Sequence, residues 1–289
     1  MNARLAAILP AVLLAAACAG PQTATDAPAT DAPAGVDMLG EMDEDTFKSL
    51  HALKPGEDLD LLGRAQEVAV PGHGAMQCYL SVPPGADAPL PGVLVIHEWW
   101  GLNDNVRLWT DRLAAEGYAA LAVDLYDGVV ASDSDAAMAA MQAVDASAAS
   151  AKLAAAHDWL TREYATGGAP TGSIGWCFGG GWSMRSALDI EGLDAAVVYY
   201  GRTDVAEDKA RAMDAAVLGI FGLRDRGITQ AYVDGVEATL AAAEADFRIE
   251  RYDADHAFGN PSSARYDHEA ASAAWEEVRG FFAERLGGR

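Results

Sequence analysis

The pentapeptide GWCFG, residues 175–179, lies between a short apolar segment at 172–175 and a segment of helical spacing at 180–190. A residue at the centre of such a glycine-flanked turn from strand to helix is presented at the end of its strand as a nucleophile. The glycines allow neighbouring backbone to approach the turn closely, and the helix N-terminus favours negative charge on the central side chain. The stretch therefore predicts a buried strand, a sharp turn that presents Cys177 and a following helix.

Outward from this turn, short apolar runs alternate with helical segments along most of the chain. The predicted strands are 75–82, 92–97, 119–124, 172–175, 195–200, 216–222 and 247–252, and the predicted helices are 105–116, 136–163, 180–190, 230–245 and 265–286. This alternation is typical of an α/β fold with a mainly parallel sheet, and runs such as GVLVIH at 92–97 suit strands buried on both faces. We therefore predict a single α/β domain whose central sheet is flanked by helices.

The composition is that of a globular protein with a strong negative charge. The chain has 289 residues, is 51% hydrophobic and carries 20 Lys and Arg against 43 Asp and Glu, a formal charge of -23. Such a surface repels phosphate backbones and anionic lipid headgroups, so nucleic acid is not expected as a partner. Three cysteines cannot form a disulfide framework and no Cys/His spacing fits a zinc site, so neither a metal nor a cofactor is expected. His97 is predicted to be a core histidine.

The N-terminal segment predicts export. Residues 1–17 combine Arg4 with an apolar run that is too short to cross a bilayer, as in a signal peptide. The end of that run resembles the lipobox of bacterial lipoproteins, in which Cys18 would be lipidated; cleavage at an Ala-x-Ala pattern without lipidation is the alternative. Either way we expect a periplasmic or membrane-anchored protein of a bacterial envelope, which meets the membrane only through an N-terminal lipid.

Three regions are expected after the signal peptide. Residues 19–35 consist mostly of Ala, Pro, Thr and Asp, a composition that predicts a disordered tether. Residues 36–66 are an N-terminal extension in which a short helix is plausible near 43–52. Residues 67–289 are the expected catalytic domain.

A cysteine nucleophile needs a base, and in the hydrolase order an acid and then a histidine follow the nucleophile along the chain. Of the two histidines after Cys177, His256 lies just beyond the last predicted strand, where open α/β sheets place their sites. His268 lies on a predicted helix and is expected to be solvated. Asp225 follows the strand before it and is the expected acid.

Other interpretations remain open for two of these residues. Cys177 would otherwise be a buried thiol or a disulfide partner of Cys78, because cysteine is commonly buried and exported proteins form disulfides. Cys78 lies in an alternating strand pattern and is predicted to be a core residue. Asp225 would otherwise be a turn aspartate paired with Arg224 or Arg226. The weaker candidates for the acid are Asp253 and Asp255.

The chain resembles the dienelactone hydrolase family of the α/β-hydrolase fold in four blocks: HEWWG at 97–101, RLAAEGY at 112–118 leading to DLY at 124–126, GWCFGG at 175–180, and HAF at 256–258. The resemblance spans about 67–286. It implies an α/β-hydrolase fold and a catalytic set of Cys177, Asp225 and His256. It also implies a helper carboxylate, Glu98, that holds the thiol and helps to form the thiolate.

Residues that follow the strand 92–97 complete the expected site. A carboxylate at Glu98 can take the proton of a thiol if burial raises its pKa, whereas an exposed glutamate would only be a solvated strand end. Trp99 and Phe178 are expected to donate their backbone N–H groups to an oxyanion. Trp100 and Tyr126 are expected to line the substrate pocket, although simple packing is the alternative for Trp100.

The sequence departs from the family where the substrate would bind. Dienelactone hydrolases resemble one another in holding a substrate carboxylate with two arginines, but 126–128 and 256–261 contain none here, and only Arg202 or Arg224 could replace them. We therefore predict hydrolysis of a small ester or lactone through an acyl thioester, in carboxymethylenebutenolidase-type chemistry, with neutral substrates preferred beside Asp127. The alternatives are a general carboxylesterase or small amidase on the same triad, and a non-catalytic envelope lipoprotein that retains the fold.

Overall fold

The computed structural model describes residues 43, 45, 46, 48, 51 and 60–287, all of which belong to one compact unit, Pro33–Arg289. The predicted signal peptide at 1–17, the lipidation site Cys18 and the tether at 19–35 lie outside the described residues. Of the extension at 36–66, the structure describes a few helical residues near Thr46 and the segment from 60 onwards. Among the described helices, none is both long enough and apolar enough to cross a membrane.

One sheet organises the described part of the chain. Its eight strands lie in the order β1-β2-β4-β3-β5-β6-β7-β8, with β1 and β2 antiparallel and every pairing from β4 to β8 parallel. The bounds are β1 Arg64–Val70, β2 Gly74–Ser81, β3 Gly92–Ile96, β4 Ala119–Val123, β5 Thr171–Trp176, β6 Ala195–Tyr199, β7 Ala216–Gly222 and β8 Phe247–Tyr252. This confirms the predicted α/β-hydrolase fold and its mainly parallel sheet.

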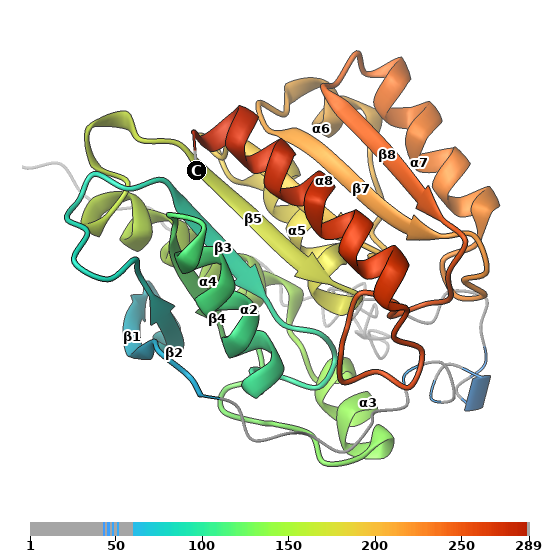
Figure 1. Cartoon of the computed structure of the whole chain (residues 1–289), viewed down its shortest axis with the longest axis horizontal. Coiled ribbons are helices and arrows are strands. Elements are labelled where there is room, and N and C mark those ends of the chain that lie inside the picture. The colour runs from blue at the N-terminus through green and yellow to red at the C-terminus, as the bar shows by residue number, and fades with distance from the viewer. Residues whose placement is uncertain (1–42, 44, 47, 49–50, 52–59, 288–289) are drawn as a thin grey trace, which may run out of the picture. The chain divides into compact units, whose positions relative to one another are not determined.

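Helices cover both faces of the sheet (Figure 1). They are α2 Asp104–Ala115, α3 Ser134–Gln142, α4 Ala146–Glu163, α5 Phe178–Asp189, α6 Glu207–Ala212, α7 Gln230–Ala242 and α8 His268–Leu286. On one face α2 packs on β2, β3 and β4, and α8 packs on β5, β6 and β7. On the other face α4 and α5 cover the centre of the sheet. Because the helices close both faces, side chains for chemistry are left at the strand ends.

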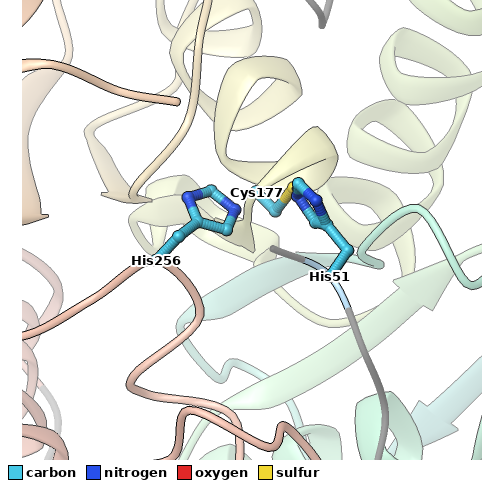
Figure 2. Close-up of side chains that lie close together, drawn as sticks. All are labelled: His51, Cys177 and His256. Carbon is cyan, nitrogen blue, oxygen red and sulfur yellow. The ribbon is translucent and has the colours of Figure 1, made fainter. Parts of the chain in front are cut away.

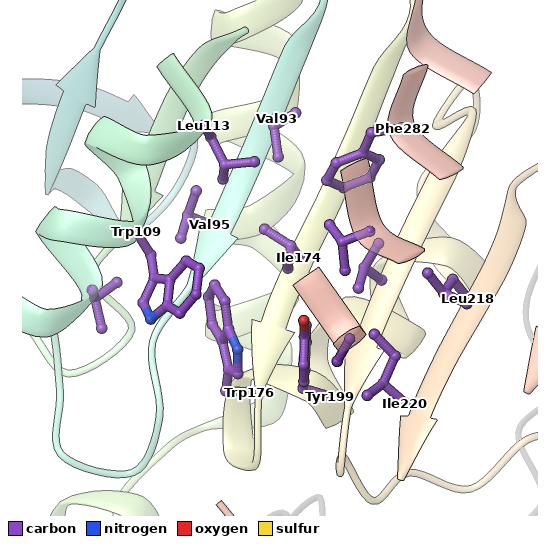
Figure 3. Close-up of a cluster of buried hydrophobic side chains, with 14 of the residues drawn as sticks. Val93, Val95, Trp109, Leu113, Ile174, Trp176, Tyr199, Leu218, Ile220 and Phe282 are labelled. Atoms are coloured by element: carbon purple, nitrogen blue, oxygen red, sulfur yellow. The ribbon is translucent and has the colours of Figure 1, made fainter. Parts of the chain in front are cut away.

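The core explains why the strands read as continuous apolar runs. Val93 and Val95 of β3 and Ile174 of β5 pack in one cluster with Trp109 of α2 and Phe282 of α8 (Figure 3). Leu94 and Ile96, the alternate residues of β3, face a second cluster under α4 and α5. A strand such as β3 therefore needs apolar residues on both faces, whereas β5 has small or polar residues such as Ser173 and Gly175 on its second face and β8 alternates with charged residues.

Two parts of the predicted secondary structure are wrong. The single helix predicted over 136–163 is two helices, because α3 ends at Gln142 and the Asp145 side chain accepts a hydrogen bond from the Ala148 N–H, which starts α4. The run of alanines hid this break, since alanine favours helix throughout. The strand β1 and the helix α6 were not predicted. In β1 most residues are exposed, because it lies at the edge of the sheet and lacks the continuous apolar run of the central strands.

Candidate active site

The turn at Cys177 has the strained geometry that the sequence predicts. Cys177 has φ 54° and ψ -114°, a conformation that a residue with a side chain rarely adopts. Its N–H donates to the Tyr199 carbonyl of β6 at 3.0 Å, and its carbonyl accepts from the Gly181 N–H of α5 at 3.0 Å. These bonds hold the side chain at the N-terminus of α5, where it is 3% exposed.

Two glycines make the turn possible. A Cβ on Gly175 would lie 2.1 Å from the Gly179 carbonyl oxygen, and a Cβ on Gly179 would lie 2.2 Å from the carbonyl oxygen of Ile96. Both distances are far shorter than a van der Waals contact, so no other residue fits without moving backbone. The second contact brings the end of β3 against the turn, and this places the loop that starts at His97 next to Cys177.

His256 and Asp225 form a buried pair. The two residues follow β8 and β7, which are neighbours in the sheet, and His256 Nδ1 lies 2.6 Å from Asp225 Oδ2. The other carboxylate oxygen of Asp225 accepts from the N–H groups of Gly227 at 2.7 Å and Ile228 at 2.8 Å. With its carboxylate fixed in this way, Asp225 orients the imidazole and leaves Nε2 directed away from the pair.

The alternative partners proposed from sequence lie elsewhere. Arg224 pairs with Asp253 at 2.7 Å and with Asp255 at 3.6 Å, so it does not pair with Asp225 and the two rival acids are engaged at the surface. His268 is exposed at the start of α8. Cys78 is buried and free, so it does not form the disulfide considered above. Burial raises the pKa of its thiol to about 12, as expected of a core residue.

Glu98 is buried in the same site and hydrogen-bonded on one side. Its Oε2 accepts from the Asn260 side-chain amide at 2.5 Å, and its Oε1 is buried without a hydrogen-bond partner among the described residues. Burial raises the pKa of Glu98 to about 7, although His256 and the Asn260 amide both act to lower it. A carboxyl group that titrates near neutrality is able to exchange a proton with a neighbouring thiol.

The electrostatics of the site couple Cys177 with its neighbours. Burial raises the pKa of the Cys177 thiol, while the His256 imidazole and the Phe178 N–H act to lower it. Burial acts to lower the pKa of His256, but Asp225 and Cys177 outweigh it and hold the pKa well above its ordinary value. The histidine is therefore able to carry the proton that the thiol loses.

Aromatic rings surround these groups. The Trp99 and Trp100 rings meet edge to face at 4.9 Å, and the Tyr126 ring lies 5.3 Å from Phe178. All four residues are buried. His97 is a core histidine, as predicted, because its Nε2 lies 3.1 Å from the Leu125 N–H and its Nδ1 lies 2.6 Å from the Glu98 carbonyl oxygen. It ties the loop after β3 to the loop after β4.

Beside Tyr126 the structure has a cavity of about 210 Å³. Asp127 and Lys152 both line it, and their side chains form an ion pair at 2.6 Å. Lys152 is buried, whereas the Asp127 side chain is 78% exposed. The segment 126–128, where the resemblance implies an arginine, thus presents an acidic residue whose charge is already paired.

Three residues of the site were not predicted from the sequence, and the first is Asn260, whose amide donates to Glu98. Tyr200 follows β6, and its ring lies 5.0 Å from the His256 ring; its position at a strand end was the available signal. His51 belongs to the N-terminal extension, is 5% exposed, and places Nε2 3.1 Å from Cys177 Sγ. No pattern in the sequence connects His51 with Cys177.

Comparisons with known proteins identify the family of the chain. The sequence profile of the dienelactone hydrolase family matches residues 76–286. A protein of Escherichia coli with the provisional name carboxymethylenebutenolidase is 30% identical over 76% of this chain and 87% of its own length. A protein of Saccharolobus solfataricus with the same provisional name is 29% identical over 75% of this chain and 97% of its own length. A crystal structure of a provisionally named dienelactone hydrolase from Klebsiella pneumoniae has a TM-score of 0.69 and 31% identity, over 77% of this chain and 99% of that one.

The parallel sheet and the strained turn at Cys177 define an α/β-hydrolase fold. The match over 76–286 shows that the chain belongs to the dienelactone hydrolase family. It is therefore a dienelactone hydrolase-like hydrolase.

Proposed function

We propose that this hydrolase cleaves small esters or lactones with Cys177 as its nucleophile, in carboxymethylenebutenolidase-type chemistry. The observation that carries the proposal is the buried His256 and Asp225 pair, 2.6 Å apart, beside a cysteine held in a strained turn at a helix N-terminus. This is the nucleophile, base and acid arrangement of acyl-transfer enzymes, and its members follow one another along the chain in the hydrolase order.

Formation of the thiolate is the first step of the proposed mechanism. Burial disfavours the charged sulfur, so a nearby group must accept its proton. His256 is the main acceptor, because Asp225 stabilises the imidazolium that results. Glu98 is the second acceptor, since its pKa of about 7 lets it take a proton at neutral pH.

Acylation and hydrolysis follow as two acyl transfers. The thiolate attacks the ester carbonyl carbon, and the N–H groups of Trp99 and Phe178 stabilise the oxyanion. The C–O bond then breaks and the leaving alcohol takes the proton from His256, which leaves a thioester on Cys177. Water gives a proton to His256 and attacks the thioester, so that the carboxylic acid leaves and the proton returns to the Cys177 sulfur.

Neutral substrates suit the pocket best. Tyr126 lines the cavity described above, and Trp99 and Trp100 are buried against each other beside the site, so an uncharged acyl or alcohol group would meet apolar surroundings. Lys152 is paired with Asp127 and is therefore not free to bind a substrate carboxylate. A carboxylate-bearing lactone would lose hydration without gaining a partner.

The site of action that we propose is outside the cytoplasm. The pattern at 1–17 supports export, and Cys18 supports attachment to a membrane by a lipid. No other partner is required by the proposed reaction.

A panel of neutral fluorogenic esters, a dienelactone and the matching amides tests the function. Cys177→Ala should lower ester hydrolysis by at least about 1,000-fold, whereas His268→Ala, which changes an exposed histidine away from the site, should keep the parental rate. Thermal unfolding of both variants checks that they fold. Parental rates in Cys177→Ala would disprove the nucleophile. Faster cleavage of the amides would favour an amidase, and no turnover by the parent protein would favour a non-catalytic binding protein.

A further inference from the structure

Three potential metal ligands from distant parts of the sequence meet at the proposed nucleophile. The ligand atoms of His51, Cys177 and His256 all lie within 4.8 Å of one another, and all three residues are buried. Figure 2 shows the side chains converging from three separate segments, with the two imidazoles next to the Cys177 sulfur. His51 lies outside 76–286, so the third ligand comes from beyond the part of the chain that matches the family profile.

The ligand chemistry suits zinc. One thiolate and two imidazoles form a borderline-soft ligand set. Such a set binds Zn²⁺ in preference to hard cations such as Mg²⁺. With Zn–S near 2.3 Å and Zn–N near 2.0 to 2.1 Å, tetrahedral geometry puts ligand atoms about 3.3 to 3.6 Å apart. The contact between His51 Nε2 and Cys177 Sγ is 3.1 Å, and the widest separation allowed by the cluster is 4.8 Å. Side-chain adjustments of about 1 Å would therefore form the site.

The surroundings prepare both histidines to bind. The Nδ1 of His256 is engaged with Asp225 at 2.6 Å, which leaves Nε2 as the atom for a metal. A carboxylate behind a histidine ligand is the usual arrangement in zinc sites. His51 is held by the ring of Trp99, 4.7 Å away, and by the ring of His256, 4.5 Å away. Its Nε2 already points at the sulfur.

We propose that His51, Cys177 and His256 bind one Zn²⁺ ion and that this binding reversibly switches off the hydrolase. The thiol and imidazole pair gives up one proton to the solvent when the sulfur coordinates zinc, and a water molecule fills the fourth position. Coordination draws electron density from the sulfur and fixes it beside the metal, so it attacks a carbonyl much more slowly, and coordinated Nε2 has no lone pair left to accept a proton. The inhibitory effect rests on the proposed function, whereas the binding itself does not.

Calorimetric titration of the full chain with Zn²⁺ after removal of bound metal by a chelator tests the binding. The parent protein should bind one ion and release at least the proton of the thiol and imidazole pair, which is measured by repeating the titration in buffers of different ionisation enthalpy. His51→Ala should weaken the affinity by at least about 100-fold, because loss of a direct ligand should cost no less than loss of a group behind one. His268→Ala removes an exposed histidine and should match the parent. Mg²⁺ should give no binding.

Ester hydrolysis measured at the same zinc concentrations tests the inhibition. In the parent, the zinc concentration that halves the rate should equal the dissociation constant from calorimetry. In His51→Ala, the zinc concentration that halves that variant's own metal-free rate should rise by the same factor as its dissociation constant. No zinc binding, or equal affinity in His51→Ala and the parent, would overturn the site. Zinc binding with undiminished turnover would overturn the inhibitory effect. If the parent proves to have no esterase activity, the proposed function fails, while the calorimetry still decides whether the site exists.

Discussion

The hydrogen bond between Asn260 and Glu98 should set the pH at which the enzyme becomes active. Asn260 donates to Glu98 Oε2 at 2.5 Å, and both residues are buried, so solvent does not screen the interaction. A hydrogen bond to a charged group contributes about 1.5 to 3 kcal/mol, and each 1.36 kcal/mol corresponds to one pKa unit. Asn260→Ala should therefore raise the pKa of Glu98, about 7 in the parent, by about 1 to 2.

The sign of the effect follows from the proposed role of Glu98. The ionised carboxylate is the form that accepts the thiol proton, so kcat/KM rises as pH rises through the pKa of Glu98. At pH 7 about half of the parent molecules carry ionised Glu98, and in Asn260→Ala about a tenth to a hundredth do. Because His256 remains the main acceptor, these fractions give the upper limit of the effect: the variant should lose up to about 5-fold to 50-fold in kcat/KM at pH 7 and recover most of it above about pH 9.

The assay is the pH dependence of kcat/KM for p-nitrophenyl acetate at constant ionic strength, corrected for spontaneous hydrolysis. Ser262→Ala is the matched control, because the Ser262 hydroxyl donates to Asn260 Oδ1 at 2.6 Å while its N–H donates to the same oxygen at 2.8 Å. That control keeps the Asn260 amide directed at Glu98 and should leave the acid limb in place. The role of Glu98 would be refuted if the rise of kcat/KM with pH on the acid side of the profile stayed at the same pH in Asn260→Ala. It would also be refuted if that rise persisted in Glu98→Gln.

Three further outcomes are expected. The folded-state pKa of Glu98, about 7, is above the ordinary 4.5, so the parent protein loses stability as pH rises between these values. In urea unfolding, Glu98→Gln should be about 3 kcal/mol more stable than the parent at pH 8 and equally stable at pH 4. Equal stability of the two proteins at both pH values would contradict the burial argument. Neutral esters should exceed their carboxylate-bearing counterparts by at least about tenfold in kcat/KM, with a smaller gap at high salt, and equal rates would reveal an unassigned anion contact. Cys18→Ala that is still processed should move from the membrane fraction to the soluble fraction, and unchanged membrane association would end the lipoprotein prediction.

The predictable part of the site lies at the ends of parallel strands. Cys177, Asp225 and His256 each lie just after a predicted strand, and the topology of a parallel sheet brings such positions to one edge. Their spacing along the chain is irrelevant, because the sheet and not the sequence separation sets the distance between them. The same logic brought Glu98 to the site from the end of β3.

His51 could not be predicted for the converse reason. It lies in an extension without an apolar period, and its contact with Cys177 at 3.1 Å joins residues 126 positions apart in sequence. Such a contact depends on how the extension packs against a finished domain. The break between α3 and α4 was not predicted for a more local reason. The surrounding alanines favour one continuous helix, but the Asp145 side chain accepts a hydrogen bond from the Ala148 N–H and so starts a new one.

The most direct test of the mechanism is to find the acyl group on the enzyme during turnover. The protein is mixed with p-nitrophenyl acetate, quenched in acid within the first turnovers, digested and mapped by mass spectrometry. The mechanism predicts one acetyl group on the peptide that contains Cys177, removable by hydroxylamine as a thioester is, and none in Cys177→Ala. Full turnover with no acetyl group on Cys177, or acetyl on another residue at the same level in Cys177→Ala, would contradict it.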